Sequence, residues 1–405
     1  MARITVATVP LAGHVNPMAM LVRALVARGH EVRWSCSETY AAAIEATGAR
    51  CDVSPWTEPE LGTRTGISRA KRQIEAMFIA PIPAQLAALE AIGGDAILAD
   101  NAHLGAALYA ERHGVPWIGL GISALMPPSI DTAPFGSALP PGNPGRNKFL
   151  NWLVFRAMFR RVNTRYRAAR VAAGLTAGEG TYFDVLSPDL FLQPTIPAFE
   201  YPRRDLPPQV KFIGPLLPRA ATAALPAWWP DLAGDRPIVL VTQGTLATEP
   251  RALIAPALAG LAGEDVWVVA TADVAGPANA RTAPFVPFDA LMPRLAAMVT
   301  NGGYGGVQMA LAHGVPLVVA GGSEEKPEIA ARVAWCGAGL DLRTGRPKPE
   351  AIRRAVRRVL DEPSFRVRAR ALAAEMAARD AAAEGVALIE GLLDARAARS
   401  HSARS

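Results

Sequence analysis

The sequence is poor in residues on which several classes of protein depend. Its 405 residues include three cysteines, which show neither the spacing of metal ligands nor an even number for pairing. These cysteines suit a reducing cytoplasm, in which a buried thiol acts as a small apolar group. No Asp-x-Asp motif occurs, although such a carboxylate pair can hold a divalent metal. We therefore expect no metal ion and no other cofactor.

Charge and long apolar runs are also scarce. Charged residues make up 19% of the chain and hydrophobic residues 50%, a balance typical of globular rather than disordered proteins. The net charge of +6 comes from basic residues spread along the chain without a nucleic-acid motif, so no nucleic-acid partner is expected. No apolar run of about 18 residues occurs, and the N-terminus leads straight into a strand pattern. We expect neither a transmembrane helix nor a signal peptide, and therefore a cytoplasmic protein.

The first half of the chain contains alternating strand and helix patterns. A strand, a loop, a helix and a second strand are expected over residues 3–9, 10–17, 18–28 and 31–35. This order makes a βαβ unit with two parallel strands. Further apolar strands follow at 96–99 and 115–120. The first half is therefore predicted to be a doubly wound parallel sheet.

A second series of strands begins after a proline-rich stretch. Its strands are expected at 238–243, 266–270, 298–300 and 315–320, with helices between them. A chain of 405 residues is too long for one ordinary core. We predict an α/β fold of two Rossmann-like domains with the following boundaries: 1–205 for the first domain, 206–236 for the linker, 237–380 for the second domain, and 381–405 for a frayed tail and a C-terminal helix that can pack back on the first domain.

A glycine cluster joins the strand that ends at Val299 to the next helix. It consists of Asn301, Gly302, Gly303, Tyr304, Gly305, Gly306 and Val307. Glycines let a backbone approach a ligand closely, and the first turn of a helix offers unpaired N–H groups and the positive end of a dipole. The cluster therefore favours a phosphate site. A tight turn without a ligand is the alternative, and it stays open.

A long aromatic and basic helix is expected over residues 147–173, after a proline- and glycine-rich loop at 127–145. Its aromatic side chains recur at helical spacing, which is typical of a stripe that faces a core. Docking on a membrane surface is the alternative for the same segment.

Short motifs along nearly the whole chain resemble those of one family. They are Gly13-His14-Val15-Asn16-Pro17, Asp100 after a buried strand, Phe212-Ile213-Gly214-Pro215, Gln243-Gly244-Thr245, Phe285-Val286-Pro287, the glycine cluster, and Ala310-Leu311-Ala312-His313-Gly314-Val315-Pro316. In this order the chain resembles the GT-B nucleotide-sugar glycosyltransferases of the macrolide and UDP-glucuronosyl/glucosyl group, glycosyltransferase family 1. The resemblance implies two Rossmann-like domains that face each other across a cleft, with the acceptor in the first and the donor in the second.

The resemblance assigns the chemistry of the first half to His14. The family's general base occupies this position, and an imidazole can take the proton of an acceptor hydroxyl. By analogy Asp100 partners His14, fixes the tautomer of the ring and stabilises the imidazolium. Gly13, Asn16 and Ser123 would line the acceptor site. A turn residue for His14 and a helix cap for Asp100 are the structural alternatives.

The resemblance assigns the nucleotide to the second half. Phe285 would stack on the nucleobase, which tolerates uracil and thymine alike, and Val286 would contact the base edge through its backbone. Gln308 would contact the ribose. The diphosphate would be held by Thr245 and by the amides of Gly305, Gly306 and Val307. A place in the core is the structural alternative for Phe285.

The sequence departs from the family at two donor positions. Asn301 stands where a histidine commonly contacts phosphate, and its amide can donate a hydrogen bond but carries no charge. Glu325-Lys326 stands where an Asp/Glu-Gln pair grips sugar hydroxyls. Lys326 can donate but not accept, so pairing with Glu325 or contact with a phosphate are its expected roles. The sugar stays open, with a deoxysugar as one candidate.

The expected reaction is a metal-independent, inverting transfer of a sugar from a TDP- or UDP-sugar to a hydroxyl of a small hydrophobic natural product. Two alternatives stay open: a membrane-lipid acceptor, and a protein that binds nucleotide sugar or a partner without catalysis. The sequence also leaves a homodimer open.

Overall fold

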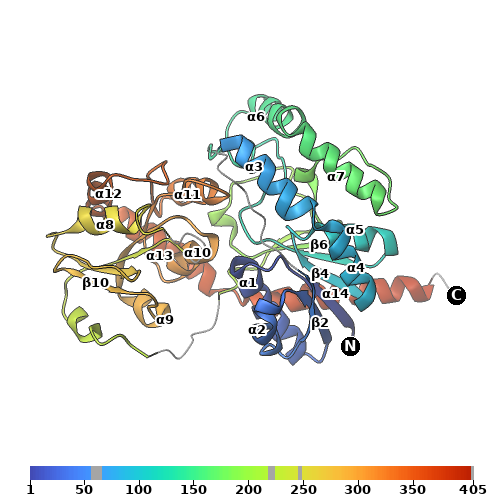
Figure 1. The fold of residues 1–405 in the computed structure, drawn as a ribbon, viewed down its shortest axis with the longest axis horizontal. Coiled ribbons are helices and arrows are strands. Elements are labelled where there is room, and N and C mark those ends of the chain that lie inside the picture. The colour runs from blue at the N-terminus through green and yellow to red at the C-terminus, as the bar shows by residue number, and fades with distance from the viewer. Residues whose placement is uncertain (56–65, 218–223, 245–248, 403–405) are drawn as a thin grey trace.

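The first domain is built on a parallel sheet of seven strands. The computed structural model describes residues 1–55, 66–217, 224–244 and 249–402 (Figure 1). The strands follow the order β3-β2-β1-β4-β5-β6-β7, and each neighbouring pair is parallel. Their bounds are β1 Arg3–Ala7, β2 Glu31–Cys36, β3 Arg50–Val53, β4 Ala96–Asp100, β5 Trp117–Leu120, β6 Leu190–Gln193 and β7 Val210–Phe212.

The second domain repeats this order with six strands, β10-β9-β8-β11-β12-β13, again all parallel. Their bounds are β8 Ile238–Thr242, β9 Trp267–Thr271, β10 Ala280–Ala283, β11 Leu295–Thr300, β12 Leu317–Val319 and β13 Gly339–Asp341. In both sheets the chain starts at a central strand, builds one side and then crosses to the other, which places a ligand crevice at the carboxyl ends of the central strands. The predicted α/β architecture with two parallel sheets is confirmed.

Helices pack on the faces of both sheets (Figure 1). Those of the first domain are α1 Ala12–Ala27, α2 Ala41–Glu45, α3 Gly66–Ile74, α4 Ile82–Ile92, α5 Leu104–His113, α6 Pro144–Asn151 and α7 Arg160–Ala172. Those that follow are α8 Ile254–Leu261, α9 Phe288–Leu291, α10 Tyr304–Ala312, α11 Lys326–Trp335, α12 Pro349–Asp361, α13 Pro363–Ala377 and α14 Ala381–Ser402. β4 is buried along its whole length, as expected for a central strand that helices cover on both faces.

The C-terminal helix α14 lies on the first domain (Figure 1). Val386 and Ile389 are buried there in an apolar cluster with α1 and the first sheet. The Arg28 guanidinium donates to the Glu390 carboxylate at 3.1 and 2.9 Å. Helical structure continues to Ser402, so the C-terminal helix predicted within 381–405 leaves little of that range for a frayed tail.

Two helix predictions need correction. α1 begins at Ala12, so the segment predicted as a loop forms its first turns, and Pro17 lies inside the helix. That proline leaves the Gly13 carbonyl without its helical donor, which is tolerable because Gly13 is exposed to water. The single helix predicted over 147–173 is instead α6, a π-helical stretch at Trp152–Met158, and α7.

Among the described residues, one continuous helical segment, Gly66–Ile92, is long and apolar enough by length and composition to cross a membrane. Because this finding concerns length and composition alone, the absence of a transmembrane helix stays a prediction. The segment joins α3, a π-helical turn at Glu75–Ile79, and α4. Ile82 and Leu89 of α4 pack in an apolar cluster with α5, so part of its apolar surface has partners within the fold.

Candidate active site

His14 lies in the first turn of α1, at the carboxyl end of β1. The backbone N–H groups of His14 and Val15 donate to the Leu11 carbonyl at 2.9 and 3.0 Å, which starts the helix at this point. The His14 side chain is 10% exposed, and its Nδ1 lies 3.1 Å from Oδ2 of Asp100. Its Nε2 has no hydrogen-bond partner in the part of the chain that the structure describes. The ring is therefore held through one nitrogen and free at the other.

Asp100 ends β4, the strand next to β1, and is fully buried. Its Oδ2 accepts a hydrogen bond from the Val9 N–H at 2.7 Å as well as facing His14. Its Oδ1 accepts from the N–H groups of Ala102 and His103 at 2.8 and 3.0 Å. Burial opposes the charge, but His14 and these hydrogen bonds outweigh it and hold the pKa of Asp100 below its ordinary value. The carboxylate is thus ionised and fixed.

His103 has a structural role. Its Nδ1 accepts from the Ala106 N–H at 3.3 Å and so caps the start of α5. Burial lowers the pKa of His103, which keeps the ring neutral. Of the two histidines next to Asp100, His14 is therefore the one with a nitrogen available for proton transfer.

The remaining acceptor candidates lie at the same edge of the first sheet. Gly13 and Asn16 are exposed on the first turns of α1. Ser123 follows β5, and its carbonyl accepts from Nε2 of Gln193 at 2.8 Å. Its hydroxyl is buried and has no hydrogen-bond partner among the described residues.

The glycine cluster forms the start of α10 at the carboxyl end of β11. Gly303 is the N-cap and provides no side-chain cap, so the first-turn N–H groups lack partners within the helix. Space is open around a Cβ at Gly305. The Val307 N–H donates to the Gly303 carbonyl at 3.0 Å, which is a correction to its expected contact with a diphosphate. Gly302 has φ +89°, and a Cβ there would meet Val319 and the backbone of Lys326.

The aromatic candidate for the nucleobase is accessible. Phe285 is 61% exposed between β10 and α9, which rules out the core interpretation, while Val286 beside it is buried. Nδ2 of Asn301 donates to the Gln243 carbonyl, and its Oδ1 is buried without a partner among the described residues. Thr245 lies outside the residues that the structure describes.

Two donor-side candidates have partners within the protein that the sequence did not predict. Gln308 is buried and exchanges hydrogen bonds with Oγ1 of Thr195 from the first domain, at 3.2 and 2.9 Å, rather than facing a ribose. Lys326 pairs with Glu324, not with Glu325. Burial raises the pKa of Glu325 above its ordinary value.

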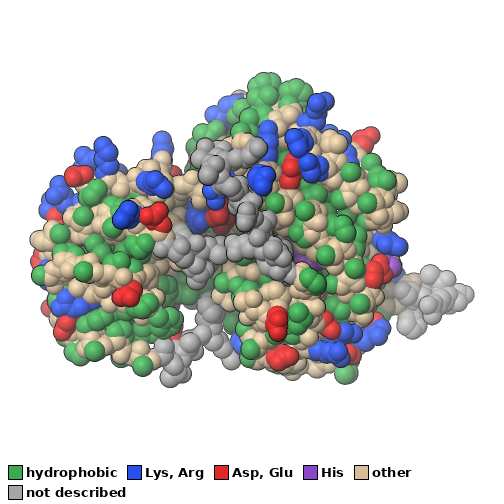
Figure 2. Space-filling model, in the orientation of Figure 1, with side chains coloured by type: hydrophobic (Ala, Val, Ile, Leu, Met, Phe, Trp, Pro, Cys, Tyr) green, Lys and Arg blue, Asp and Glu red, His purple; other side chains and the backbone are tan. Residues whose placement is uncertain are grey.

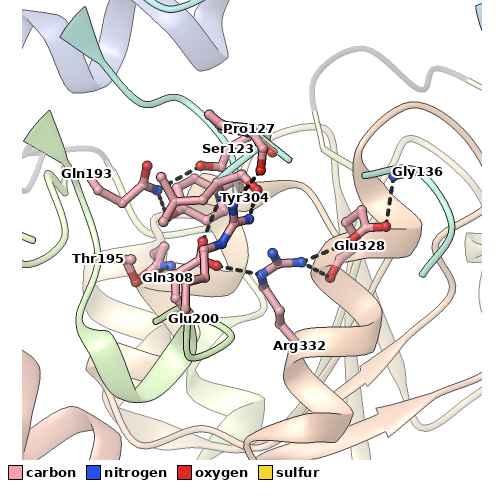
Figure 3. Close-up of polar contacts among 12 residues, drawn as sticks. Ser123, Pro127, Gly136, Gln193, Thr195, Glu200, Tyr304, Gln308, Glu328 and Arg332 are labelled. Carbon is pink, nitrogen blue, oxygen red and sulfur yellow. Dashed lines mark hydrogen bonds and ion pairs between the residues drawn. The ribbon is translucent and has the colours of Figure 1, made fainter. Parts of the chain in front are cut away.

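A buried polar network that the sequence patterns did not predict lies between the domains (Figure 3). Arg332 of α11 donates to the carboxylates of Glu200 and Glu328, each at 2.9 Å. Gln193 of the first domain donates to the Tyr304 hydroxyl at 3.0 Å. The only local signal was the spacing of Glu328 and Arg332, four residues apart on one helix, which also describes an ordinary exposed ion pair.

Comparisons with known proteins agree with this arrangement. Residues 266–392 match the family model described as erythromycin biosynthesis protein CIII-like, C-terminal domain. The chain is 44% identical to 4'-demethylrebeccamycin synthase of Lentzea aerocolonigenes, covering 97% of this chain and 100% of that protein. It is 32% identical to UDP-glucosyltransferase B1 of Starmerella bombicola, covering 91% and 93%.

Solved structures show the same fold. The glycotransferase of kitacinnamycin has a TM-score of 0.79 at 24% identity, covering 97% of this chain and 99% of that one. The calicheamicin glycosyltransferase CalG4 has a TM-score of 0.78 at 22% identity, covering 97% and 98%.

Two parallel-sheet domains with these structural relatives define a GT-B glycosyltransferase fold, as predicted. The chain belongs to the natural-product glycosyltransferases, to which it is related over almost its whole length. It is therefore an enzyme, and the interpretation as a protein without catalysis is set aside.

Proposed function

We propose that this enzyme transfers a sugar from a TDP- or UDP-sugar to a hydroxyl of a small hydrophobic natural product, with inversion and without a metal. The observation that carries the proposal is the His14–Asp100 pair, 3.1 Å apart at the carboxyl edge of the first sheet. Relatives named as UDP-glucosyltransferases and a structural neighbour, the glycosyltransferase VinC in complex with DTDP, support the two donor classes.

His14 acts as the general base. Its Nδ1–H donates to the ionised Asp100, which leaves the lone pair of Nε2 to accept the proton of the acceptor hydroxyl. The oxygen attacks the anomeric carbon as the bond to the departing phosphate oxygen breaks, and that oxygen keeps the electron pair. Attack from the face opposite the leaving group inverts the configuration. Asp100 stabilises the imidazolium that forms.

The second domain stabilises the leaving diphosphate. The first-turn amides of α10, with Gly305 open to a ligand, direct N–H groups and the positive helix end toward the negative charge. Phe285 is exposed for stacking on the base. Because backbone groups supply this stabilisation, a neutral Asn301 is sufficient and no metal is required.

The sugar is proposed to carry fewer hydroxyl contacts than glucose. Glu325 is half-buried and can accept hydroxyl protons, whereas the Lys326 ammonium is occupied by Glu324. A deoxysugar has fewer hydroxyl groups and therefore needs fewer hydrogen-bond partners near Glu325 and Lys326.

The test is a product assay with UDP-glucose, TDP-glucose and TDP-rhamnose against 4-methylumbelliferone as a planar phenolic acceptor. We expect a glycoside by mass spectrometry, an inverted anomeric centre by NMR coupling constants, and unchanged rate in EDTA. Retained configuration, or loss of activity in EDTA, would contradict the mechanism. Titration with UDP and TDP followed by the melting temperature tests the donor site separately.

A lipid acceptor is the second candidate, because one surface combines exposed apolar and basic side chains. Phe149 and Trp152 are 57% and 55% exposed, and their rings stack at 6.4 Å. Figure 2 shows hydrophobic side chains over α6 with Lys and Arg beside them. Co-sedimentation with vesicles containing phosphatidylglycerol tests this candidate. Absence of pelleting at low salt would remove it.

A further inference from the structure

We propose that Glu328 and Arg332 of α11 are positioning residues that fix the acceptor-side segment, residues 124–138, against the donor half of the enzyme. This inference rests on the proposed function, which assigns the acceptor to the first domain and the donor to the second. The contacts run between chain segments far apart in sequence and bury charged groups in the domain boundary (Figure 3).

Glu328 binds one end of the acceptor-side segment. Its Oε1 accepts from the N–H groups of Gly136 and Ala138 at 2.8 and 2.7 Å. Both residues have positive φ, +93° and +53°, so alternate amides turn toward the same oxygen. Such a turn of backbone N–H groups is an anion-binding concavity, and here the anion is a side chain of the other domain.

Arg332 joins Glu328 to the other end of the segment. The guanidinium lies 4.2 Å from the centre of the Tyr201 ring and donates to Oε2 of both Glu328 and Glu200 at 2.9 Å. Glu200 in turn accepts from the Leu125 N–H at 3.0 Å through Oε1. Burial opposes the charge, but the two carboxylates hold the pKa of Arg332 above its ordinary value. The ions are paired, hydrogen-bonded and buried, which is the arrangement in which loss of one partner matters most.

The same helix carries the proposed sugar contact. Glu325 is the N-cap of α11, and the spacing i, i+3 and i+7 places Glu325, Glu328 and Arg332 along one face of the helix. If the Glu325 end of α11 moves, the contacts of Glu328 and Arg332 therefore move residues 124–138, the segment that follows Ser123. This geometry predicts that the contact sets how the acceptor is placed, not how the nucleotide binds.

The contact can be weakened from the loop side without removing a charge. Gly136→Ala places a Cβ on a residue with φ +93° and open space around it, so backbone preference alone opposes the native turn. Gly234→Ala is the matched control, because it has φ +94° and open space and lies just before β8, outside the segment 124–138. In hydrogen–deuterium exchange of the full chain, we expect residues 134–139 to lose protection in Gly136→Ala and in Glu328→Gln but not in the control. Equal exchange in all four proteins would overturn the inference.

Kinetics separate positioning from general loosening. With TDP-glucose and 4-methylumbelliferone, we expect Gly136→Ala and Glu328→Ala to raise the acceptor KM by about tenfold, because misplaced substrate loses rate steeply. The KM for the donor should stay within about twofold, and Glu328→Gln, which keeps an oxygen for the two amides, should recover part of the loss. An unchanged acceptor KM in Gly136→Ala, or an equal rise in Gly234→Ala, would contradict the inference.

The two proposals fail differently. If the wild-type chain makes no product with any donor, the proposed function fails while the exchange experiment still decides the contact. If Glu328→Ala does not fold, Gly136→Ala and the charge-free triple variant Glu200→Gln/Glu328→Gln/Arg332→Met carry the test, since removal of a whole buried ion network is often tolerated.

Discussion

Asp100 and Asn301 occupy corresponding places in the two halves of the molecule. Asp100 ends β4, which pairs with β1, and Asn301 follows β11, which pairs with β8. Asp100 accepts a hydrogen bond from the Val9 N–H beyond β1, whereas Asn301 donates one to the Gln243 carbonyl beyond β8. The same position therefore carries a buried charge in one domain and a neutral amide in the other.

The difference teaches how the two halves divide the reaction. The first half fixes one ionised side chain through four polar contacts so that it can orient His14. The second half leaves first-turn backbone amides of α10 available and needs no negative charge beside them. A carboxylate at Asn301 would repel the diphosphate that this half is proposed to bind. In the proposed mechanism, side-chain chemistry therefore belongs to the first domain and backbone electrostatics to the second.

The largest expected effect follows from removal of the His14 side chain, which should lower turnover and leave nucleotide binding to the second domain unchanged. His14→Ala should lower kcat by about 10²- to 10⁴-fold, because the acceptor loses its general base. Calorimetric titration should give dissociation constants for UDP and TDP that match the wild type. Normal turnover in this variant would refute the assignment of the base.

Asp100→Asn should lower kcat by about 10²-fold, because an amide no longer selects the tautomer of His14 or stabilises its charged form. Whichever way the amide turns, its NH₂ faces N–H donors, which should cost about 1–3 kcal/mol of unfolding free energy. Denaturant unfolding and steady-state kinetics measure the two effects. A variant with wild-type turnover would show that Asp100 serves only to accept hydrogen bonds from backbone N–H groups.

The reciprocal change, Asn301→Asp, should weaken UDP and TDP binding by about tenfold, or about 1.4 kcal/mol, since the new carboxylate faces both the Gln243 carbonyl and the phosphate site. With saturating donor, kcat should change little. Calorimetry provides the affinity, and an affinity equal to that of the wild type would separate Asn301 from the donor site.

Gly13 and Gly305 provide a smaller, matched comparison. Each is the second residue of its helix, α1 or α10, and each has open space for a Cβ. Gly305→Ala should cost about 0.5–1.5 kcal/mol of nucleotide affinity by covering an amide, while Gly13→Ala should leave that affinity unchanged and raise the acceptor KM. Nucleotide titrations of both variants measure this contrast. An equal loss of nucleotide affinity in the two variants would contradict it.

The smallest effect is on stability and depends on pH. The pKa of Glu325 is raised in the folded state, so its ionised form destabilises the fold above that pKa and costs nothing below the unfolded value. Glu325→Gln should therefore raise the melting temperature near about pH 8 and lose this gain near about pH 4. Asp100 has a lowered pKa, so its contribution is present above the unfolded value and is lost as the pH falls through the folded value. If the gain in melting temperature of Glu325→Gln instead grew toward acid pH, the pKa of Glu325 would not be raised in the folded state.

Local patterns were enough to predict the central strands of the two sheets, β2-β1-β4-β5 and β9-β8-β11-β12, but not the outer strands β3, β6, β7, β10 and β13. Strands such as 238–243 and 96–99 are continuous apolar runs bounded by turns, and buried parallel strands require that pattern. The start of α1 was missed because Pro17 suggested a loop, although a proline is tolerated where the carbonyl it deprives faces water. The break in the helix at Trp152–Met158 has no proline or glycine to announce it.

The contacts between the two domains could not be predicted, because they join residues far apart in the sequence and leave no local pattern. Glu200 and Arg332 are separated by 132 positions, and Thr195 and Gln308 by 113. In the sequence, a glutamine within a helix looks the same whether it faces a ribose or another domain. Only the three-dimensional arrangement shows that Gln308 bonds to Thr195 and that Lys326 bonds to Glu324.

The division of labour between the domains is tested most directly by measuring Asp100→Asn and Asn301→Asp side by side, for turnover at saturating donor and for affinity toward UDP and TDP. The account predicts a crossed result: Asp100→Asn loses turnover and keeps nucleotide affinity, whereas Asn301→Asp loses affinity and keeps turnover. If both variants lose the same quantity, the two halves do not divide the reaction in this way.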